Sequence, residues 1–519
     1  MQYLVSGKEM KLLDQNTSSV FHVPELVLME QAAMAFVRKL FSLKEEYHKN
    51  VKSVLILCGS GNNGADGMAV ARLLMQTGLN VCTCLCGEQV GHTTSGSYKT
   101  QKSICQAYGM RMTKELSQEN FDLIIDALFG IGLSRNIEGE LADVIQKVNE
   151  ADAWRVAVDI SSGVHADDGA ILNVAFAADD TITFSFGKIG QFLWPGSDAS
   201  GRISIVSMGI TKESWLDRKP HLAMLEKDDI KRLLPKRTDH SNKGTYGKLL
   251  VIAGSVNMAG AAVMCARAAY RSGVGLVKVL TAEENRVSIQ TILPEAILST
   301  YGVKIDESQV IEELKWADAV VLGPGIGTDK NAQKLVELVL KNCAVPLLLD
   351  ADALNVIAEE PEVLLRPHTE MIITPHLGEM ARLTGDAVSL IQSRLVESAF
   401  TFAQTYNVVC VLKDFHTITA IPYALGYLNL SGNNGMATAG SGDVLSGIIG
   451  AMLAQGMTAD LAAPLGVYLH GLAGDKAAKA TGERALIATD LIEALPMVYE
   501  TKFSMKDFNQ NDDKNNRKA

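Results

Sequence analysis

Short apolar runs that alternate with segments of helical spacing dominate this chain from about residue 51 to residue 499. In the first half the runs lie at 54–57, 81–85, 123–125, 156–158, 181–184 and 203–206, and in the second half at 249–252, 319–322, 346–350, 371–374 and 408–413. Glycine turns and helical segments separate most of them. Strands this short and this apolar are typical of parallel sheets that helices cover on both faces. The pattern therefore predicts an α/β fold built around two sheets.

The alternation of apolar runs and helical segments is interrupted near residues 212–242, which marks the boundary between two domains. Charged residues cluster there, and Pro220 and Pro235 interrupt the segment. The chain has 519 residues, a length that allows two to four domains, since domains commonly span roughly 100–200 residues. We expect a first domain at residues 1–215 and a second at residues 222–503. Residues 504–519 are rich in Asn, Asp and Lys, and we expect them to form a disordered tail.

The composition excludes several classes of protein. Hydrophobic residues make up 47% of the chain, which is too many for a mainly disordered protein, and 8 cysteines are too few for a disulfide scaffold. The net charge of −11 argues against non-specific binding to nucleic acid or acidic lipid. No apolar window reaches the roughly 18 residues of a membrane span, and the first ten residues lack the pattern of a signal peptide. We therefore expect a cytoplasmic protein with free thiols and with no nucleic-acid or membrane partner.

Three cysteines alternate along one expected strand, which places Cys82, Cys84 and Cys86 on the same face. They could bind a metal. Free cysteines pack like small apolar residues, however, so we favour their interpretation as buried core residues.

A glycine-rich turn joins the run at 54–57 to a helical segment expected at 68–76. Gly59, Gly61 and Gly64 match the spacing G-x-G-x-x-G, which lets backbone N–H groups approach an anion at a helix N-terminus. A tight turn that needs small residues would give the same spacing. The polar side chains of Asn62, Asn63 and Asp66 exceed what a phosphate cradle needs, and they favour a binding site.

Two further strands of the first half end in aspartate, at Asp126 and Asp159. Because the carboxyl ends of parallel strands share one edge, these side chains are expected to converge with the glycine-rich turn. Asn63, Asp126 and Ser162 would then offer oxygen ligands to an alkali or alkaline-earth cation. Asp159 could act as an acid or a base. Each aspartate alone could instead cap a helix.

The second half carries its strongest signal at residues 433–447, where glycines precede an apolar helix. Gly440 to Gly442 would offer N–H groups to a phosphoryl group, and Asp443 could take a proton from a substrate hydroxyl. A capped glycine turn between helices is the alternative. His376 follows one strand. Lys413 ends another and, together with residues 414–417, could hold a nucleotide phosphate.

The motifs of the first half resemble those of the NAD(P)H-hydrate epimerase (YjeF N-terminal) family. The match covers roughly residues 1–209 and rests on residues 62–67, 126–132 and 159–163, with 28–33 similar to the family's N-terminal helix motif. The resemblance implies a Rossmann-like three-layer αβα domain, proton transfer by Asp159, and potassium bound by Asn63, Asp126 and Ser162. It also implies that hydrated nicotinamide nucleotide is bound by Asn62, Asn63, Gly64, Ala65, Asp66, Gly130, Ile131, Gly132, Leu133, Ser134, Arg135, Asn136 and Asp159.

The motifs of the second half resemble the ADP/ATP-dependent NAD(P)H-hydrate dehydratase family of the ribokinase-like superfamily. Residues 246–248, 323–325, 374–379 and 440–443 carry this match, which covers about residues 222–499. The resemblance implies a ribokinase-like αβα domain with Asp443 as its catalytic residue. It implies that the hydrated cofactor contacts Ala261, Gly325, His376 and Asp443, and that the adenine nucleotide contacts Lys413, Asp414, Phe415, His416, Thr417 and Gly442.

Together the two resemblances imply a bifunctional enzyme that repairs hydrated NADH and NADPH. One domain would interconvert the R and S epimers, and the other would dehydrate the S epimer with ADP or ATP and Mg²⁺ as phosphate donor. The superfamily also implies a homo-oligomer. The alternative is a small-molecule hydroxyl kinase fused to a non-catalytic ligand-binding or scaffold domain.

Overall fold

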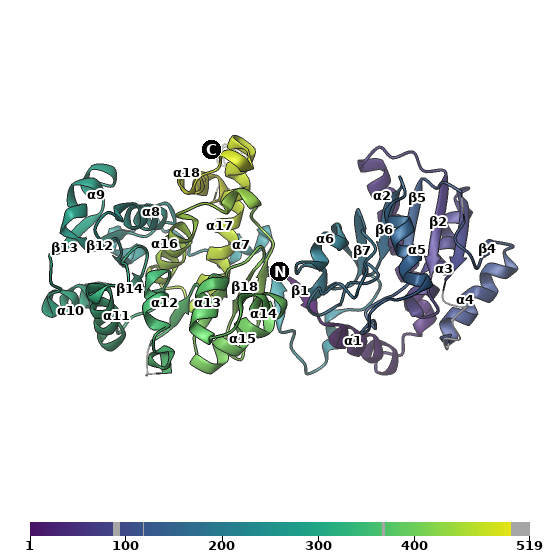
Figure 1. Ribbon diagram of the computed structural model, residues 1–519, viewed down its shortest axis with the longest axis horizontal. Coiled ribbons are helices and arrows are strands. Elements are labelled where there is room, and N and C mark those ends of the chain that lie inside the picture. Colours follow the sequence, from purple (N-terminus) through teal and green to yellow (C-terminus); the bar gives the residue numbers. More distant parts are fainter. Residues whose placement is uncertain (87–93, 118, 366–368, 500–519) are drawn as a thin grey trace, which may run out of the picture. The chain divides into compact units, whose positions relative to one another are not determined.

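The computed structural model describes residues 1–86, 94–117, 119–365 and 369–499. Contacts divide the chain into two compact units, one at Gln2–Ala223 and the other made of Met1 with the chain from Met224 onward. We call these the first and the second unit. Each has an αβα architecture, so the expectation of two α/β domains is confirmed (Figure 1). The tail expected at residues 504–519 lies outside the described residues.

The first unit is built on a parallel sheet with the strand order β4-β3-β2-β5-β6-β7-β9. The order changes direction between β2 and β5, which is the doubly wound arrangement that places ligands at the carboxyl ends of these two strands. Its strands are β2 (Ser53–Cys58), β3 (Asn80–Leu85), β4 (Arg111–Thr113), β5 (Leu123–Ala127), β6 (Trp154–Val158), β7 (Asp180–Phe184) and β9 (Arg202–Val206). In addition, β1 (Gln2–Val5) pairs in parallel with β8 (Gly187–Lys188).

Alternate side chains of β2 enter different layers of the first unit, as expected for a strand buried on both faces. Val54 and Ile56 pack with helices α2 (Glu25–Glu46) and α3 (Asn62–Gln76). Leu55 and Leu57 pack with α5 (Glu140–Asn149) on the other face. The remaining helices of this unit are α1 (Gly7–Ser19), α4 (Gly96–Ala107) and α6 (Gly196–Ser200).

Two expectations about the first unit can be checked against the described elements. Cys82, Cys84 and Cys86 are buried together in the core beside α5, so their interpretation as core residues is confirmed, and all eight cysteines are free. The predicted start of the helix after β2 was wrong. It was expected at residue 68, but α3 begins at Asn62, so the polar motif itself forms the first helical turns. The Asn, Gly and Asp residues at this end hid the boundary, because they have weak helix propensity.

The second unit contains a larger sheet with the order β13-β12-β11-β14-β15-β16-β17-β18-β19. Pairing is parallel from β13 to β17 and antiparallel along β17-β18-β19. The strands are β11 (Lys248–Ile252), β12 (Leu276–Ala282), β13 (Ile297–Tyr301), β14 (Ala319–Leu322), β15 (Leu347–Leu349), β16 (Met371–Ile373), β17 (Val409–Leu412), β18 (Thr417–Ala420) and β19 (Gly426–Asn429).

Helices cover both faces of this sheet (Figure 1). On one face lie α8 (Ala259–Arg271), α16 (Ser441–Ala454), α17 (Ala459–Thr481) and α18 (Ala488–Tyr499). On the other lie α10 (Glu307–Trp316), α11 (Lys330–Asn342), α12 (Asp352–Ile357), α13 (Leu377–Thr384), α14 (Val388–Ser393) and α15 (Leu395–Tyr406). Helix α9 (Arg286–Ile292) follows β12. The apolar residues 444–474 form most of α16 and the first part of α17.

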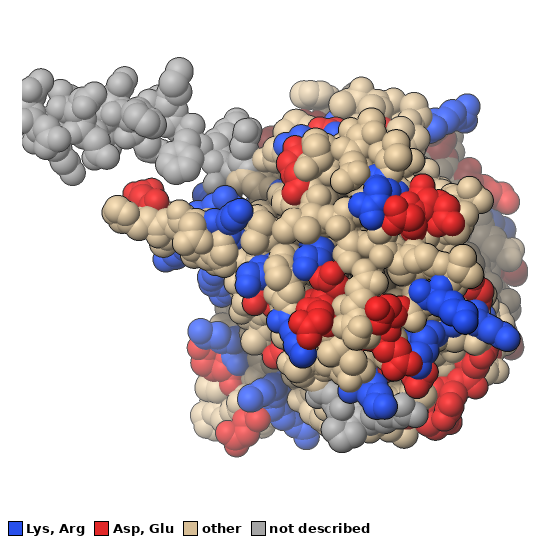
Figure 2. All heavy atoms as spheres, turned by 90° about the vertical axis from the view of Figure 1, so that its left-hand side faces the viewer, with Lys and Arg blue, Asp and Glu red and all other residues tan. Residues whose placement is uncertain are grey.

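Acidic and basic side chains are interspersed on the face of the second unit near β13, α9 and α10 (Figure 2). Among the described residues, no helix is long and apolar enough to cross a bilayer.

Candidate active sites

The glycine-rich turn of the first unit follows the carboxyl end of β2, at the point where the strand order changes direction between β2 and β5. A Cβ atom on Gly59 would come within 1.9 Å of the Leu128 carbonyl oxygen, and one on Gly64 within 1.9 Å of the Gly59 carbonyl oxygen. Both positions therefore need glycine, because backbone atoms cannot yield to a side chain. This confirms a tight turn, and the same packing brings the N-terminus of α3 against the strand ends, where it can also face a ligand.

An oxygen-rich cluster lies beneath this turn. The buried Asp126 carboxylate accepts hydrogen bonds from the Ser162 N–H and the Ser162 hydroxyl, each at 2.7 Å. The Ser162 hydroxyl oxygen also accepts a bond from the Phe129 N–H at 2.9 Å, and the Asn63 amide donates to the Phe129 carbonyl at 2.8 Å. Burial raises the pKa of Asp126 to about 6, although the bonds from Ser162 oppose the shift. The structure thus brings together Asn63, Asp126 and Ser162, as the sequence predicts.

A buried lysine holds Asp159 in place. Asp159 has a left-handed backbone with φ 66°, and its side chain accepts hydrogen bonds from the Phe184 N–H at 3.0 Å and the Thr183 hydroxyl at 3.2 Å. The ammonium of Lys188 forms an ion pair with the same carboxylate oxygen and also donates to the Thr183 hydroxyl at 2.9 Å. The Lys188 side chain is 0% exposed, whereas that of Asp159 is 14% exposed. The carboxylate is therefore fixed and still accessible.

Asp159 opens into a cavity of about 380 Å³. Its walls come from α1, α2, the start of α3 and the turns after β5 and β6. Of the residues expected to bind substrate, Asn62, Asp66, Ile131 and Asp159 line the cavity. The others lie outside its lining, namely Asn63, Gly64, Ala65, Gly130, Gly132, Leu133, Ser134, Arg135 and Asn136. Leu133 packs against the core beside α5.

Two residues of this cavity region were missed by the sequence analysis. Lys188 is a fully buried lysine, and its signal was a single lysine among apolar residues, since buried lysines need a partner. Asp14, on α1, lines the cavity, and burial together with the charge of Asp159 raises its pKa to about 7. Only the tertiary structure relates α1 to Asp159.

In the second unit, α16 begins at the edge of a cavity of about 790 Å³. Gly440 precedes it with φ 90°, a conformation that favours glycine, and Gly442 and Asp443 lie in its first turn. The first N–H groups of a helix lack partners within the helix, so this end can bind an anion. Burial raises the pKa of Asp443 to about 7, and the charge of Asp350 adds to the shift. Asp443 can therefore exchange a proton near neutral pH.

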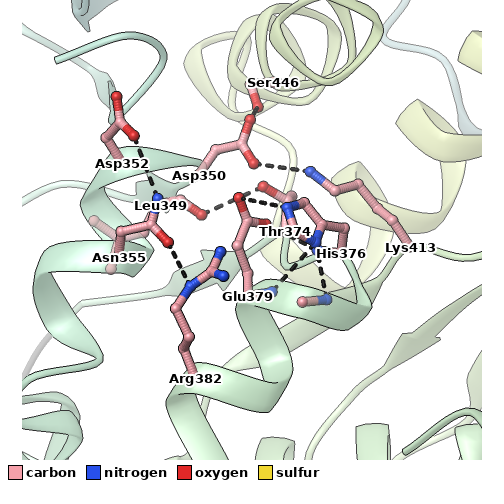
Figure 3. Close-up of polar contacts among 11 residues, drawn as sticks. Leu349, Asp350, Asp352, Asn355, Thr374, His376, Glu379, Arg382, Lys413 and Ser446 are labelled. Atoms are coloured by element: carbon pink, nitrogen blue, oxygen red, sulfur yellow. Dashed lines mark hydrogen bonds and ion pairs between the residues drawn. The ribbon is translucent and has the colours of Figure 1, made fainter. Parts of the chain in front are cut away.

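An ion pair between the half-buried Lys413 and the buried Asp350 lies next to this helix end (Figure 3). The Lys413 ammonium contacts Asp350 at 3.0 Å, and the Ser446 hydroxyl of α16 donates to the other Asp350 oxygen at 2.7 Å. Burial alone would lower the pKa of Lys413, but the charges of Asp350 and Glu379 outweigh it and raise that pKa. A Cβ atom on Gly442 would lie 3.5 Å from the Lys413 ammonium. A positive charge thus faces the proposed phosphate position.

His376 caps α13 and also faces the cavity (Figure 3). Its Nδ1 accepts hydrogen bonds from the Gly378 N–H at 2.9 Å and the Glu379 N–H at 3.2 Å. Because Nδ1 accepts, a neutral ring carries its hydrogen on Nε2. Burial and the charge of Lys413 lower the pKa of His376. The ring therefore has a structural role and offers an Nε2–H donor.

Most residues expected in this second site line one cavity, namely His376, Lys413, Asp414, Phe415, His416, Thr417, Gly442 and Asp443. Ala261 and Gly325 lie outside the lining but beside each other, since a Cβ atom on Gly325 would come within 2.9 Å of the Ala261 Cβ. The sequence analysis missed Asp350, Glu379 and the buried His470, which also line the cavity. Asp350 had a signal, because it directly follows a strand.

Family models match both parts of the chain. The model described as NAD(P)H-hydrate dehydratase matches residues 249–497, and the model described as YjeF-related protein N-terminus matches residues 25–190. Both resemblances found in the sequence are thereby confirmed.

Similar proteins match nearly the full length. A bifunctional NAD(P)H-hydrate repair enzyme Nnr from Moorella thermoacetica is 36% identical, over 96% of this chain and 96% of that protein. The protein of the same name from Escherichia coli is 37% identical, over 91% and 89% of the two chains. The solved structure of an ADP/ATP-dependent NAD(P)H-hydrate dehydratase from Bacillus subtilis, co-crystallised with ATP/Mg²⁺, is 33% identical over 53% of this chain and 97% of that chain, with a TM-score of 0.48.

Proposed function

Because the chain belongs to the family of bifunctional NAD(P)H-hydrate repair enzymes, we propose that it restores NADH and NADPH from their hydrated forms. The first unit interconverts the R and S epimers, and the second unit dehydrates the S epimer with ADP or ATP, releasing AMP and phosphate when ADP is the donor. The observation that carries this proposal is a paired arrangement. In each unit, a glycine-rich helix start and an accessible aspartate lie at the same cavity. The aspartate is Asp159 in the first unit and Asp443 in the second.

Dehydration begins with a hydroxyl that is a poor leaving group. Asp443 removes the proton from this hydroxyl as the oxygen attacks the terminal phosphate of the nucleotide. The N–H groups at the start of α16 and the Lys413 ammonium stabilise the charge that develops on the phosphoryl oxygens. The phosphorylated oxygen then leaves as phosphate, and the adjacent ring carbon loses a proton, which restores the ring double bond.

Epimerisation requires that the configuration of the hydroxyl-bearing carbon be broken and remade. Asp159 acts as the base, because the Lys188 ammonium holds one of its carboxylate oxygens and its second oxygen remains available to the cavity. The turn that follows β6 fixes the direction of this side chain.

Two cations fit the donor atoms of these sites. Oxygen ligands suited to potassium come from Asn63, Asp126 and Ser162, and the ion would neutralise the buried Asp126 carboxylate. Gly130 leaves room for Asn63, because a Cβ atom on Gly130 would lie 3.3 Å from the Asn63 Cβ. Asp350 and Glu379 supply carboxylates for Mg²⁺ bound with the nucleotide, which would offset phosphate charge. Homo-oligomer formation and a cytoplasmic location stay predictions, and light scattering after size-exclusion chromatography tests the first.

The full chain tests the proposal when it is incubated with mixed epimers of hydrated NADH, ADP, Mg²⁺ and K⁺. We expect complete recovery of NADH absorbance. Asp443→Ala should abolish recovery but leave epimer exchange intact, whereas Asp159→Ala should stop recovery once the S epimer is consumed. Absence of recovery by the wild type would refute the repair function. Phosphorylation of an unrelated alcohol alone would instead support the hydroxyl-kinase alternative, which the family membership does not favour.

A further inference from the structure

A second carboxyl group lines the cavity of the first unit and has no role in the mechanism above. Asp14 belongs to α1, whose Met10, Lys11, Gln15 and Ser18 line the same cavity. Asp159 comes from a different wall, the turn after β6. The two carboxyl groups therefore reach one cavity from separate elements.

The surroundings of the two groups differ. Asp159 is paired with Lys188 and accepts two further hydrogen bonds. In the described part of the chain, the Asp14 carboxyl has neither a hydrogen-bond partner nor an ion pair, although it is half-buried. Burying a carboxyl without a partner is costly, so such a group marks a functional position.

The charged groups around Asp14 explain its protonation. Burial contributes most to the rise of its pKa to about 7, the charges of Asp159 and Glu25 add to it, and Lys188 opposes it. Lys11 and Asp66 also line the cavity. A carboxyl that binds a proton near neutral pH, on the same cavity as a carboxylate paired with a lysine, is the arrangement that lets two acids take opposite roles.

We propose that Asp14 is the second proton-transfer residue of the epimerisation and acts as the acid while Asp159 acts as the base. This inference rests on the proposed epimerase function. Hydration of a dihydropyridine places the hydroxyl on the carbon bonded to the ring nitrogen. Asp14 protonates that hydroxyl, the C–O bond breaks with its electron pair leaving on water, and the nitrogen lone pair forms a C=N bond.

Water then adds to the same carbon from the opposite face, the C=N electrons return to nitrogen, and Asp159 accepts the proton released. The substrate gains and loses one proton and one water, so the reaction balances without an oxidant or reductant. After one turnover Asp14 is deprotonated and Asp159 is protonated. The enzyme in this state can convert the other epimer in the reverse direction, or it returns to its starting state by exchanging protons with solvent.

Two other carboxyl groups of the cavity fit this role less well. Glu25 already accepts hydrogen bonds from the Asn62 amide at 2.9 Å and the Ser97 hydroxyl at 3.0 Å. Asp66 lies on the same element as Asn62, and burial together with the charge of Asp159 raises its pKa well above the usual range. Asp66 therefore keeps its proton and suits a hydrogen bond to the substrate.

The full chain tests this proposal through Asp14→Asn, Asp14→Glu and the control Asp143→Asn, which makes the same change on the exposed face of α5. We expect Asp14→Asn to lower kcat for epimer exchange about 100-fold, a usual loss for one acid–base group. Asp14→Glu should restore part of it, and Asp143→Asn should change nothing. Dehydration of the pure S epimer should stay within about twofold in every variant, since a single site acts there.

Two readouts separate catalysis from a structural role. Exchange by the wild type in H₂¹⁸O should place ¹⁸O on the ring hydroxyl in every epimerised molecule, and its rate should fall as pH rises through about 7. The residual rate of epimer exchange by Asp14→Asn should not fall as pH rises over this range. Exchange by that variant within threefold of the wild type, or wild-type exchange without ¹⁸O, would overturn the role of Asp14 alone. A wild type without any exchange would overturn the epimerase function and this inference together.

Discussion

Lys188→Met isolates the contribution of the buried ion pair in the first unit. Methionine keeps the length and most of the volume of the lysine side chain but removes the ammonium. The Asp159 carboxylate then loses its ion-pair partner, and the Thr183 hydroxyl loses a donor at 2.9 Å. No other basic side chain contacts Asp159 among the residues that the structure describes.

The expected loss follows from burial. Removing one partner of a buried pair costs about 3–5 kcal/mol of unfolding free energy, because the remaining charge stays uncompensated. Lys188 is 0% exposed, but Asp159 is 14% exposed toward the cavity, where water can solvate it. We therefore expect the lower end, about 3 kcal/mol. Epimer exchange should fall at least tenfold because the base is no longer oriented, whereas dehydration of the S epimer should not change.

Urea unfolding followed by tryptophan fluorescence measures this loss, since Trp154, Trp194 and Trp215 lie in the first unit and only Trp316 in the second. Asp159→Asn and the double variant complete a cycle. The double variant should be more stable than the sum of the single losses predicts, by at least about 1 kcal/mol, because it leaves no unpaired charge. A Lys188→Met protein that loses under about 0.5 kcal/mol, the usual size of a surface substitution, and keeps wild-type exchange would refute the reasoning.

Three further outcomes are expected. Dehydration should speed up as pH rises through about 7, because the ionised form of Asp443 takes the proton, and an NADH absorbance assay that shows a flat profile from pH 6 to 8 would contradict this. Ser162→Ala should raise the potassium concentration needed for half-maximal epimer exchange about tenfold, as loss of one supporting contact does at metal sites, and an unchanged KCl titration would count against the site. Gly64→Ala should cost about 3 kcal/mol of unfolding free energy through overpacking, since its Cβ would come within 1.9 Å of a carbonyl oxygen; equal urea midpoints would show that the turn can relax.

Local sequence was sufficient to predict the main strands and helices and some of the residues of each site. The apolar runs at 54–57 and 319–322 correspond to β2 and β14, because a strand buried on both faces must be apolar throughout. The glycine spacing located the start of α16, whereas α3 begins inside its motif, at Asn62 rather than at residue 68. Asp126 and Asp159 were predicted because each lies at the carboxyl end of a strand, and these ends share one edge of the parallel sheet of the first unit. Asp443 was predicted because it lies at the start of a helix.

Other features depended on the tertiary structure. Lys188 pairs with a residue 29 positions away, and Lys413 pairs with a residue 63 positions away, through strand order that no local pattern encodes. The protonation of Asp14 depends on burial and on the nearby charge of Asp159, which belong to separate elements. The sequence by itself thus determined which chemical groups stand at the strand ends. The structure decided which of them are paired, buried or left to carry a proton, because burial and charge pairing arise only when distant segments pack together.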